Sequence, residues 1–222
     1  MNPPSPKRRR DPHDSRRITP RRGAVVGLCS AALGLLLFAG CSLLPQAQTD
    51  PTKFYVLSRP ATTGEPAAKG PAIYLRPVEL ASYIKSKPLI VRRGDNEIEF
   101  HEYARWGEPL EQGIGRLLRE ELLARGAASA VLAARLRAAD VAYDYLLTVR
   151  VLACEGGVDG AVFFRAVWEL STANSTTPTI VAQGDYRPID LRWDGKNETA
   201  LVGQISQAVA GLAGEITAAL KK

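Results

Sequence analysis

The sequence predicts an α+β fold in a single domain, with a mixed, mostly antiparallel sheet covered on one face by two long helices. Three observations predict it. Alternating apolar and polar residues, the period of a half-buried strand, recur between residues 54 and 186. Apolar stripes with helical spacing follow Pro109 and Asn197. Short turns join the last three strand patterns, which favours antiparallel neighbours.

The strand patterns follow one another along the chain. Phe54–Leu57 and Ile73–Leu75 are short candidates, separated by a loop rich in Pro, Gly, Thr and Ala. Pro88–Arg93 and Glu97–His101 form a predicted hairpin, with Ile98 and Phe100 on its buried face. Three longer strands follow, whose alternating apolar sets are Tyr145, Leu147, Val149, Val151 and Ala153, then Val162, Phe164, Ala166, Trp168 and Leu170, then Ile180, Ala182, Gly184 and Tyr186.

Both helices have recognisable ends. Pro109 suits the first turn of one helix, and Gly126 suits the position just past its last turn. Asn197 is the predicted N-cap of the other. The two apolar stripes consist of Leu110, Ile114, Leu117, Leu118 and Leu122, and of Leu201, Ile205, Ala208, Val209, Leu212, Ile216 and Leu220.

The first 40 residues have the layout of a secretory signal. Eight Lys or Arg residues precede an uncharged apolar run from Gly23 to Gly40, and the small residues Ala39-Gly40 lie directly before Cys41. This is the pattern of the bacterial lipoprotein pathway, in which the cysteine thiol is alkylated with diacylglycerol. We therefore predict cleavage between Gly40 and Cys41, lipidation of Cys41, a tether of residues 41–52 and a periplasmic domain of residues 53–222.

Two alternatives stay open at this end of the chain. Cys29 is a competing cysteine, although the bulky Leu28 before it is a poor cleavage site. Ala24–Leu44 also has about the 20 apolar residues that span a bilayer, so the segment could remain as an uncleaved anchor. Ser42 stands where Asp would favour retention in the inner membrane. The predicted location is therefore the outer membrane, facing the periplasm.

The charge distribution argues against a nucleic-acid partner. The formal net charge is +6, and residues 1–40 hold eight basic and two acidic residues. The remainder keeps 21 of the 29 basic and 21 of the 23 acidic residues, a net charge of zero. Because the basic excess lies in the predicted signal, the domain lacks the positive charge that nucleic-acid binding needs.

The sequence offers little catalytic or metal chemistry. Ser82-Tyr83-Ile84-Lys85 matches Ser-x-x-Lys, but the companion Ser-Asp-Asn and Lys-Thr-Gly motifs are absent. His101 is the only histidine after the signal, too few for a zinc site with the single free thiol, Cys154. No phosphate-binding glycine loop is present, so any ATPase is a separate subunit. Cys154 is predicted to be a small buried hydrophobe. We expect no enzyme, no cofactor and no metal.

Three residues are candidates for docking a partner, since Trp and Arg are enriched in interface hot spots. They are Arg105, Trp106 and Trp193. The alternative for Arg105-Trp106 is a structural corner, with Trp106 packed beneath the helix start and Arg105 paired with a carboxylate. Trp193 is predicted to be exposed, because it lies in a loop between Arg192 and Asp194.

The segment from Val78 to Leu122 closely resembles a known family. In order, it contains Val78, Tyr83-Ile84, Pro88, Ile90-Val91, Arg93, Asn96, Arg105-Trp106, Glu108-Pro109-Leu110 and Glu121-Leu122. This pattern is similar to that of the ABC-type transport auxiliary lipoproteins, the PqiC/YmbA-like family. Phe54-Tyr55-Val56-Leu57, Asp144-Tyr145 and Trp168-Glu169-Leu170 fit the same pattern.

The resemblance implies a non-enzymatic role in the cell envelope and a fold like the N-terminal domain of TolB. Such proteins look like outer-membrane-anchored partners of lipid transport systems. The implied partners are an MCE-domain protein that bridges the periplasm and its inner-membrane permease and ATPase, with envelope integrity as the outcome. An alternative function is a lipoprotein that carries its own apolar ligand between sheet and helices. Homo-oligomerisation stays open.

Overall fold

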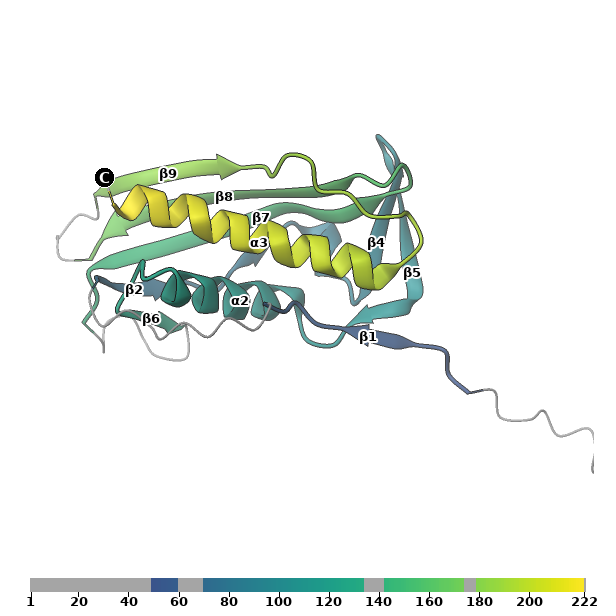
Figure 1. Cartoon of the computed structure of the whole chain (residues 1–222), viewed down its shortest axis with the longest axis horizontal. Helices are drawn as coiled ribbons and strands as arrows, with labels where there is room; N and C mark the ends of the chain where they lie inside the picture. Colours follow the sequence, from purple (N-terminus) through teal and green to yellow (C-terminus); the bar gives the residue numbers. More distant parts are fainter. Residues whose placement is uncertain (1–48, 60–69, 134–141, 174–178, 222) are drawn as a thin grey trace, which may run out of the picture. The chain divides into compact units, whose positions relative to one another are not determined.

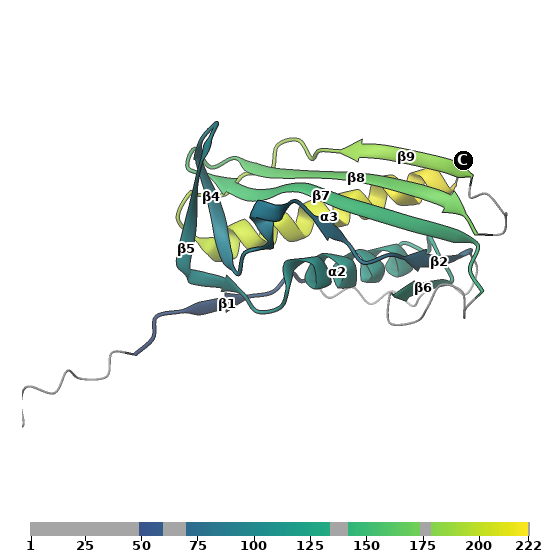
Figure 2. The same cartoon turned by 180° about the vertical axis from the view of Figure 1, so that it is seen from behind.

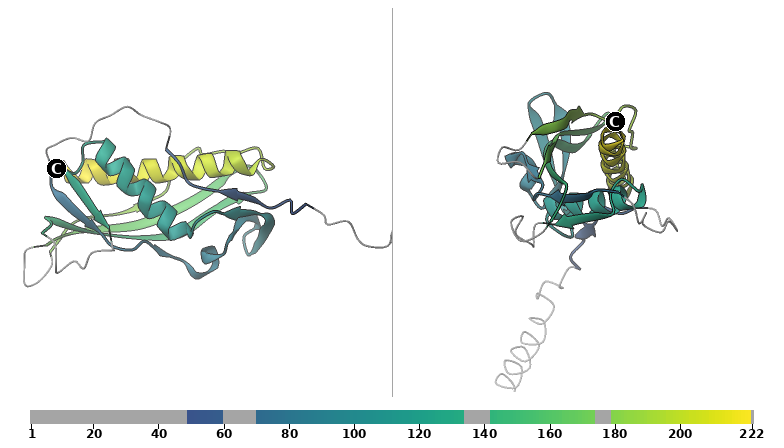
Figure 3. Two further views of the ribbon diagram at one scale, coloured as in Figure 1. Left: turned by 90° about the horizontal axis from the view of Figure 1, so that it is seen from below. Right: turned by 90° about the vertical axis from the view of Figure 1, so that its left-hand side faces the viewer.

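The computed structural model describes residues 49–59, 70–133, 142–173 and 179–221. Residues 50–222 form one compact unit. In the described part of this unit the strands make one nine-stranded sheet, and both long helices lie on the same side of it (Figures 1 and 3). The predicted α+β class, with two helices on one face of a mixed sheet, is confirmed.

Strand β7 (Tyr145–Gly157) is the centre of the sheet. Along one edge it pairs antiparallel with β8 (Val162–Thr172), which pairs antiparallel with β9 (Ile180–Tyr186). Along its other edge β7 pairs in succession with three short parallel strands, which are β2 (Ala72–Leu75), β3 (Glu79–Leu80) and β4 (Pro88–Gly94). Figure 2 shows β2 and β4 along this edge.

Beyond β4 and β2, the sheet is extended by further strands from the N-terminal half of the domain. Strand β4 forms an antiparallel hairpin with β5 (Glu97–Trp106), and β1 (Lys53–Tyr55) runs parallel to β5 at the outer edge. Strand β6 (Ala130–Ala133) runs parallel to β2 at the other end. Most paired residues belong to the three antiparallel pairings, because the parallel ones are only two to four residues long.

Helices α2 (Leu110–Ala124) and α3 (Glu198–Leu220) begin and end where the sequence predicts. The Asn197 side chain accepts a hydrogen bond from the Thr199 amide at 3.0 Å. Gly126 adopts φ +63°, a conformation that glycine reaches without steric cost. The stripe residues of both helices are buried against the sheet and each other, with Leu220 partly exposed.

Three predicted orientations along the strands are wrong. Ile180 was assigned to the apolar face of β9, but it is 51% exposed, and the β8–β9 ladder shifts register beside it. Phe100 was assigned to the buried face of β5, but its side chain is 40% exposed. Ala153 was assigned to the core face of β7, but the ladder with β8 shifts register between Val151 and Ala153. An extra residue in one strand moves the following side chains to opposite faces, and Cys154 takes the core position instead.

The Cys154 thiol is expected to be unreactive in the folded protein. The residue is buried, as predicted, and burial raises the pKa of its thiol, with Glu155 adding to the effect. The thiolate is the reactive form, so a maleimide should modify Cys154 in purified mature protein far more slowly before denaturation than after it. Equal rates in the two states would contradict the buried position.

A buried carboxylate ties strands β4 and β7 to the short 3-10 helix η2 (Ser82–Lys85). Glu155 is only 1% exposed, and its carboxylate accepts hydrogen bonds from the Arg92 Nε at 3.0 Å and the Tyr83 hydroxyl at 2.8 Å. The Cys154 amide donates a further bond at 3.0 Å. Burial and the bond to Glu155 raise the pKa of Tyr83. The Glu155 carboxylate is therefore buried together with the groups that donate hydrogen bonds to it, which is the condition for burying a charged side chain.

Candidate functional site

The predicted lipidation site lies outside the described residues. Gly40 and Cys41 belong to residues 1–48, and so does the whole apolar run before Cys41. Among the described residues, neither helix has the length and apolarity that a bilayer-spanning segment requires. What the structure adds is the surface of the domain to which the tether leads.

Arg105 and Trp106 occupy a structural corner at the end of β5. Trp106 is buried in the core, and its amide donates to the Lys87 carbonyl at 2.8 Å. Arg105 Nε donates to the Glu102 carbonyl at 2.8 Å, and its guanidinium lies 3.6 Å from the Glu102 carboxylate. The burial of Trp106 and the Arg105–Glu102 pair fit the structural interpretation, although the Arg105 side chain keeps part of its surface in solvent.

Trp193 is buried, so the prediction that it is exposed is wrong. Its side chain is 7% exposed, and Nε1 donates to the Gly157 carbonyl at 3.0 Å. The indole lies against Gly156, where the missing side chain leaves room for the ring. The Trp193 amide bonds to the Gly160 carbonyl, which folds its loop back onto the β7–β8 turn. The adjacent glycines at the end of β7 were the sequence signal for this burial, because a glycine in a strand often marks a place where another group approaches the backbone closely.

Replacing Gly156 with alanine is expected to destabilise the domain. A Cβ at this position would lie 2.8 Å from Trp193 Cζ2, which is shorter than any normal carbon–carbon contact. Overpacking of this kind costs about 1–3 kcal/mol. Urea unfolding followed by tryptophan fluorescence measures the loss. Gly94→Ala is the matched control, since a Cβ there meets nothing within 4 Å; equal midpoints for the two variants would contradict the contact.

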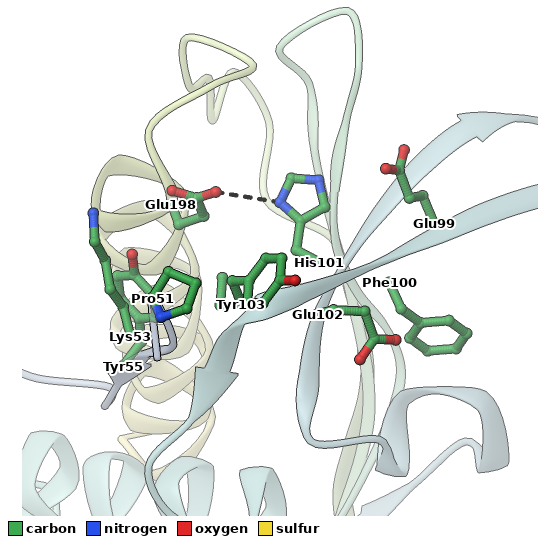
Figure 4. Close-up of a pocket in the computed structure, with 10 residues that line it drawn as sticks. Pro51, Lys53, Tyr55, Glu99, Phe100, His101, Glu102, Tyr103 and Glu198 are labelled. Atoms are coloured by element: carbon green, nitrogen blue, oxygen red, sulfur yellow. Dashed lines mark hydrogen bonds and ion pairs between the residues drawn. The ribbon is translucent and has the colours of Figure 1, made fainter. Parts of the chain in front are cut away.

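An open pocket of about 550 Å³ lies between β5 and the start of α3 (Figure 4). Its residues are Pro51, Lys53, Tyr55, Glu99, Phe100, His101, Glu102, Tyr103, Ala104 and Glu198. His101 Nδ1 lies 3.3 Å from the Glu198 carboxylate, and this pair joins β5 to α3. His101 is thus partly buried rather than an exposed strand residue.

The described residues show no arrangement typical of a hydrolase or a metal centre. The pocket lining contains no serine, threonine or cysteine beside His101. In the part of the chain that the structure describes, no cluster of three or more His, Cys, Asp or Glu side chains could hold a metal ion. Ser82 and Lys85 lie exposed on η2.

A group of exposed apolar side chains on β1 and β5 was not predicted. Phe54 is 69% exposed and Tyr103 is 64% exposed, and Val56 is also exposed. Phe54 lies opposite Arg105 in the parallel β1–β5 register, so these two side chains share one face of the sheet edge, and Tyr103 lies two residues before Arg105 on β5. We call Phe54, Val56, Tyr103 and Arg105 the β1–β5 patch. Alternating strand residues predict which side chains share a face, but not which face stays uncovered.

Comparison with known proteins gives one family and a set of similar folds. The family model described as ABC-type transport auxiliary lipoprotein component matches residues 55–217. The crystal structure of protein XCC0632 from Xanthomonas campestris has a TM-score of 0.58 at 18% identity, covering 75% of this chain and 93% of that one. A crystal structure of an uncharacterized protein has a TM-score of 0.57 at 17% identity, covering 75% and 96%. At such identities the likeness shows the fold alone. No curated protein matches the sequence.

Proposed function

The chain belongs to the ABC-type transport auxiliary lipoprotein component family, and from this we propose that it is the outer-membrane-anchored adaptor of an intermembrane lipid transport system. In this proposal Cys41 carries the lipid, and the domain of residues 53–222 docks an MCE-domain protein that bridges the periplasm. The permease and ATPase are separate inner-membrane subunits. The expected outcome of the system is an intact envelope barrier.

The family match is the observation that carries the proposal. It spans residues 55–217 and so covers nearly the whole domain behind the predicted anchor. The signal layout before Cys41 agrees with a lipoprotein, and Ser42 favours the outer membrane. Of the three docking candidates only Arg105 lies at the surface, which leaves Trp106 and Trp193 with structural roles.

The packing of the domain favours an adaptor over a lipid carrier. A carrier needs an apolar cavity between sheet and helices. In the described residues, side chains from both layers form one continuous buried cluster there, which includes Leu147 and Leu170 from the sheet and Leu118, Ile205 and Val209 from the helices. A non-enzymatic role is part of the same proposal and follows from the family, which is described as a transport auxiliary component.

Affinity purification of the full-length protein from crosslinked cells tests the proposal. We expect to recover an MCE-domain protein together with its permease. The matched control is the Cys41→Ala chain, from which the same proteins should be largely lost, because the domain is no longer held at the outer membrane. If only outer-membrane proteins or phospholipid in a solvent extract are recovered, the carrier function replaces the adaptor.

A further inference from the structure

The β1–β5 patch places apolar side chains in water without an evident role in the fold. Burying a side chain of the size of Phe or Val is worth about 1.5–3 kcal/mol, so an uncovered pair of aromatic rings is a costly arrangement. Single exposed apolar residues are common, but Phe54, Val56 and Tyr103 are grouped on two adjacent strands. A contiguous apolar group of this kind marks an interaction surface.

The position of the β1–β5 patch in the chain indicates that the membrane is the surface it contacts. Strand β1 is the first strand of the domain, and only residues 42–53 separate Phe54 from Cys41. Thirteen peptide steps span at most about 45 Å when fully extended, and a flexible chain of this length has a typical end-to-end distance of about 20 Å. If Cys41 carries the lipid, as the proposed function holds, the patch never leaves the neighbourhood of the membrane.

The chemistry of the patch suits the interfacial region of a bilayer. Tyr and Phe rings sit at the level of the lipid headgroups, and Lys and Arg stems cover apolar surface while their cations reach phosphate oxygens. Arg105 provides such a cation directly opposite Phe54. The nearby Glu102 carboxylate is well exposed and offsets part of this charge. The patch is therefore suited to contact through apolar insertion rather than to a strongly anionic surface.

We propose that the β1–β5 patch lies on the surface of the membrane that holds the lipid anchor, and that it fixes the orientation of the domain relative to that membrane. This proposal rests on the proposed anchoring through Cys41. A weak apolar contact suffices, because the tether converts it into an intramolecular event at high effective concentration. Arg105 then contacts lipid headgroups rather than a protein partner, and a transport protein docks on another face.

A fluorescent label on the patch tests the contact. The full-length Tyr103→Cys chain is expressed, and the mature protein is purified, labelled with a polarity-sensitive NBD dye and reconstituted into phosphatidylcholine–phosphatidylethanolamine vesicles. Cys154 is buried and stays unlabelled in the folded protein. Val181→Cys on β9 is the matched control, as Val181 is also exposed. We expect a several-fold gain in emission and quenching by doxyl-labelled lipid at position 103, with neither at position 181.

Mass spectrometry of the same samples distinguishes loss of the membrane contact from absence of the lipid anchor. A lipidated Cys41 with a water-exposed label at position 103 overturns the membrane contact alone. An unmodified Cys41 overturns the anchoring and this inference together. The label at position 103 could instead be shielded from water without vesicles, and more strongly at higher protein concentration. That result identifies a second copy of this chain as the partner that covers the β1–β5 patch. Shielding that requires the transport protein identifies that protein instead. Either result overturns the membrane contact.

Discussion

Replacing Cys41 with alanine is expected to leave residues 1–40 on the chain and to abolish delivery of the domain to the outer membrane. Without the thiol no diacylglycerol is attached, and the lipoprotein pathway cleaves only the alkylated precursor. The apolar run Gly23–Gly40 then stays in the protein. Two acyl chains give a stable anchor where one gives marginal binding, so nothing else in the tether replaces them. Intact mass, membrane fractionation and entry of an apolar dye into cells measure the three consequences.

Cys29→Ala is the matched control for this experiment. Cys29 is the competing cysteine in the same apolar run, and its replacement should change neither the mass of the mature chain nor the permeability of the cells. The domain itself should stay folded in both variants, since neither residue belongs to the compact unit of residues 50–222. If Cys41→Ala yields the same mature mass and an intact barrier in cells without a redundant homologue, Cys41 is not the lipidation site.

Replacing Arg92 with alanine is expected to lower the free energy of unfolding by about 3 kcal/mol or more, because it leaves the buried Glu155 carboxylate without its ion pair. Glu155 is 1% exposed, and among the described residues its one charged donor is Arg92, with Tyr83 and the Cys154 amide as neutral donors. Tyr83→Phe should cost less, about 1–2 kcal/mol, because it removes one hydrogen bond. Urea unfolding of the mature protein measures both.

Arg150→Ala is the matched control for the buried pair. Arg150 also bonds a glutamate from another strand, with its Nε 2.9 Å from the Glu79 carboxylate, but both side chains are more than half exposed. Exposed ion pairs contribute about 0–1 kcal/mol, so this substitution should have little effect. If Arg92→Ala and Arg150→Ala shift the urea midpoint equally, burial of Glu155 does not govern the stability of the pair.

The parts of the fold that the sequence predicted well are those with a long regular pattern. Strand β8 places all five of its predicted apolar residues in the core, and α2 and α3 begin and end near the predicted caps. The missed strands β3 and β6 have two and four residues. Strands so short have no measurable period, and their pairing with β7 and β2 depends on distant segments.

The candidate surface was harder to predict, because exposure depends on what the rest of the chain covers. Trp193 lies in a polar loop, yet Gly156 gives its ring a place in the core. Phe54 lies in a predicted strand of mostly apolar residues, yet nothing in the described part of the domain covers its face of β1. For Arg105-Trp106 the sequence left docking and a structural corner open, and the burial of Trp106 fits the corner.

The central position of β7 also determines when this domain can fold. Strands β2, β3 and β4 are made early in synthesis, but each lacks its pairing with β7 until residues 145–157 follow. Pairings between segments so far apart in the sequence close large loops. Folding is therefore slow and waits until the C-terminal part of the chain has been made. A protein that must cross a membrane as an extended thread gains from this delay, because the N-terminal half cannot lock into a compact body while the C-terminal half is still on the other side.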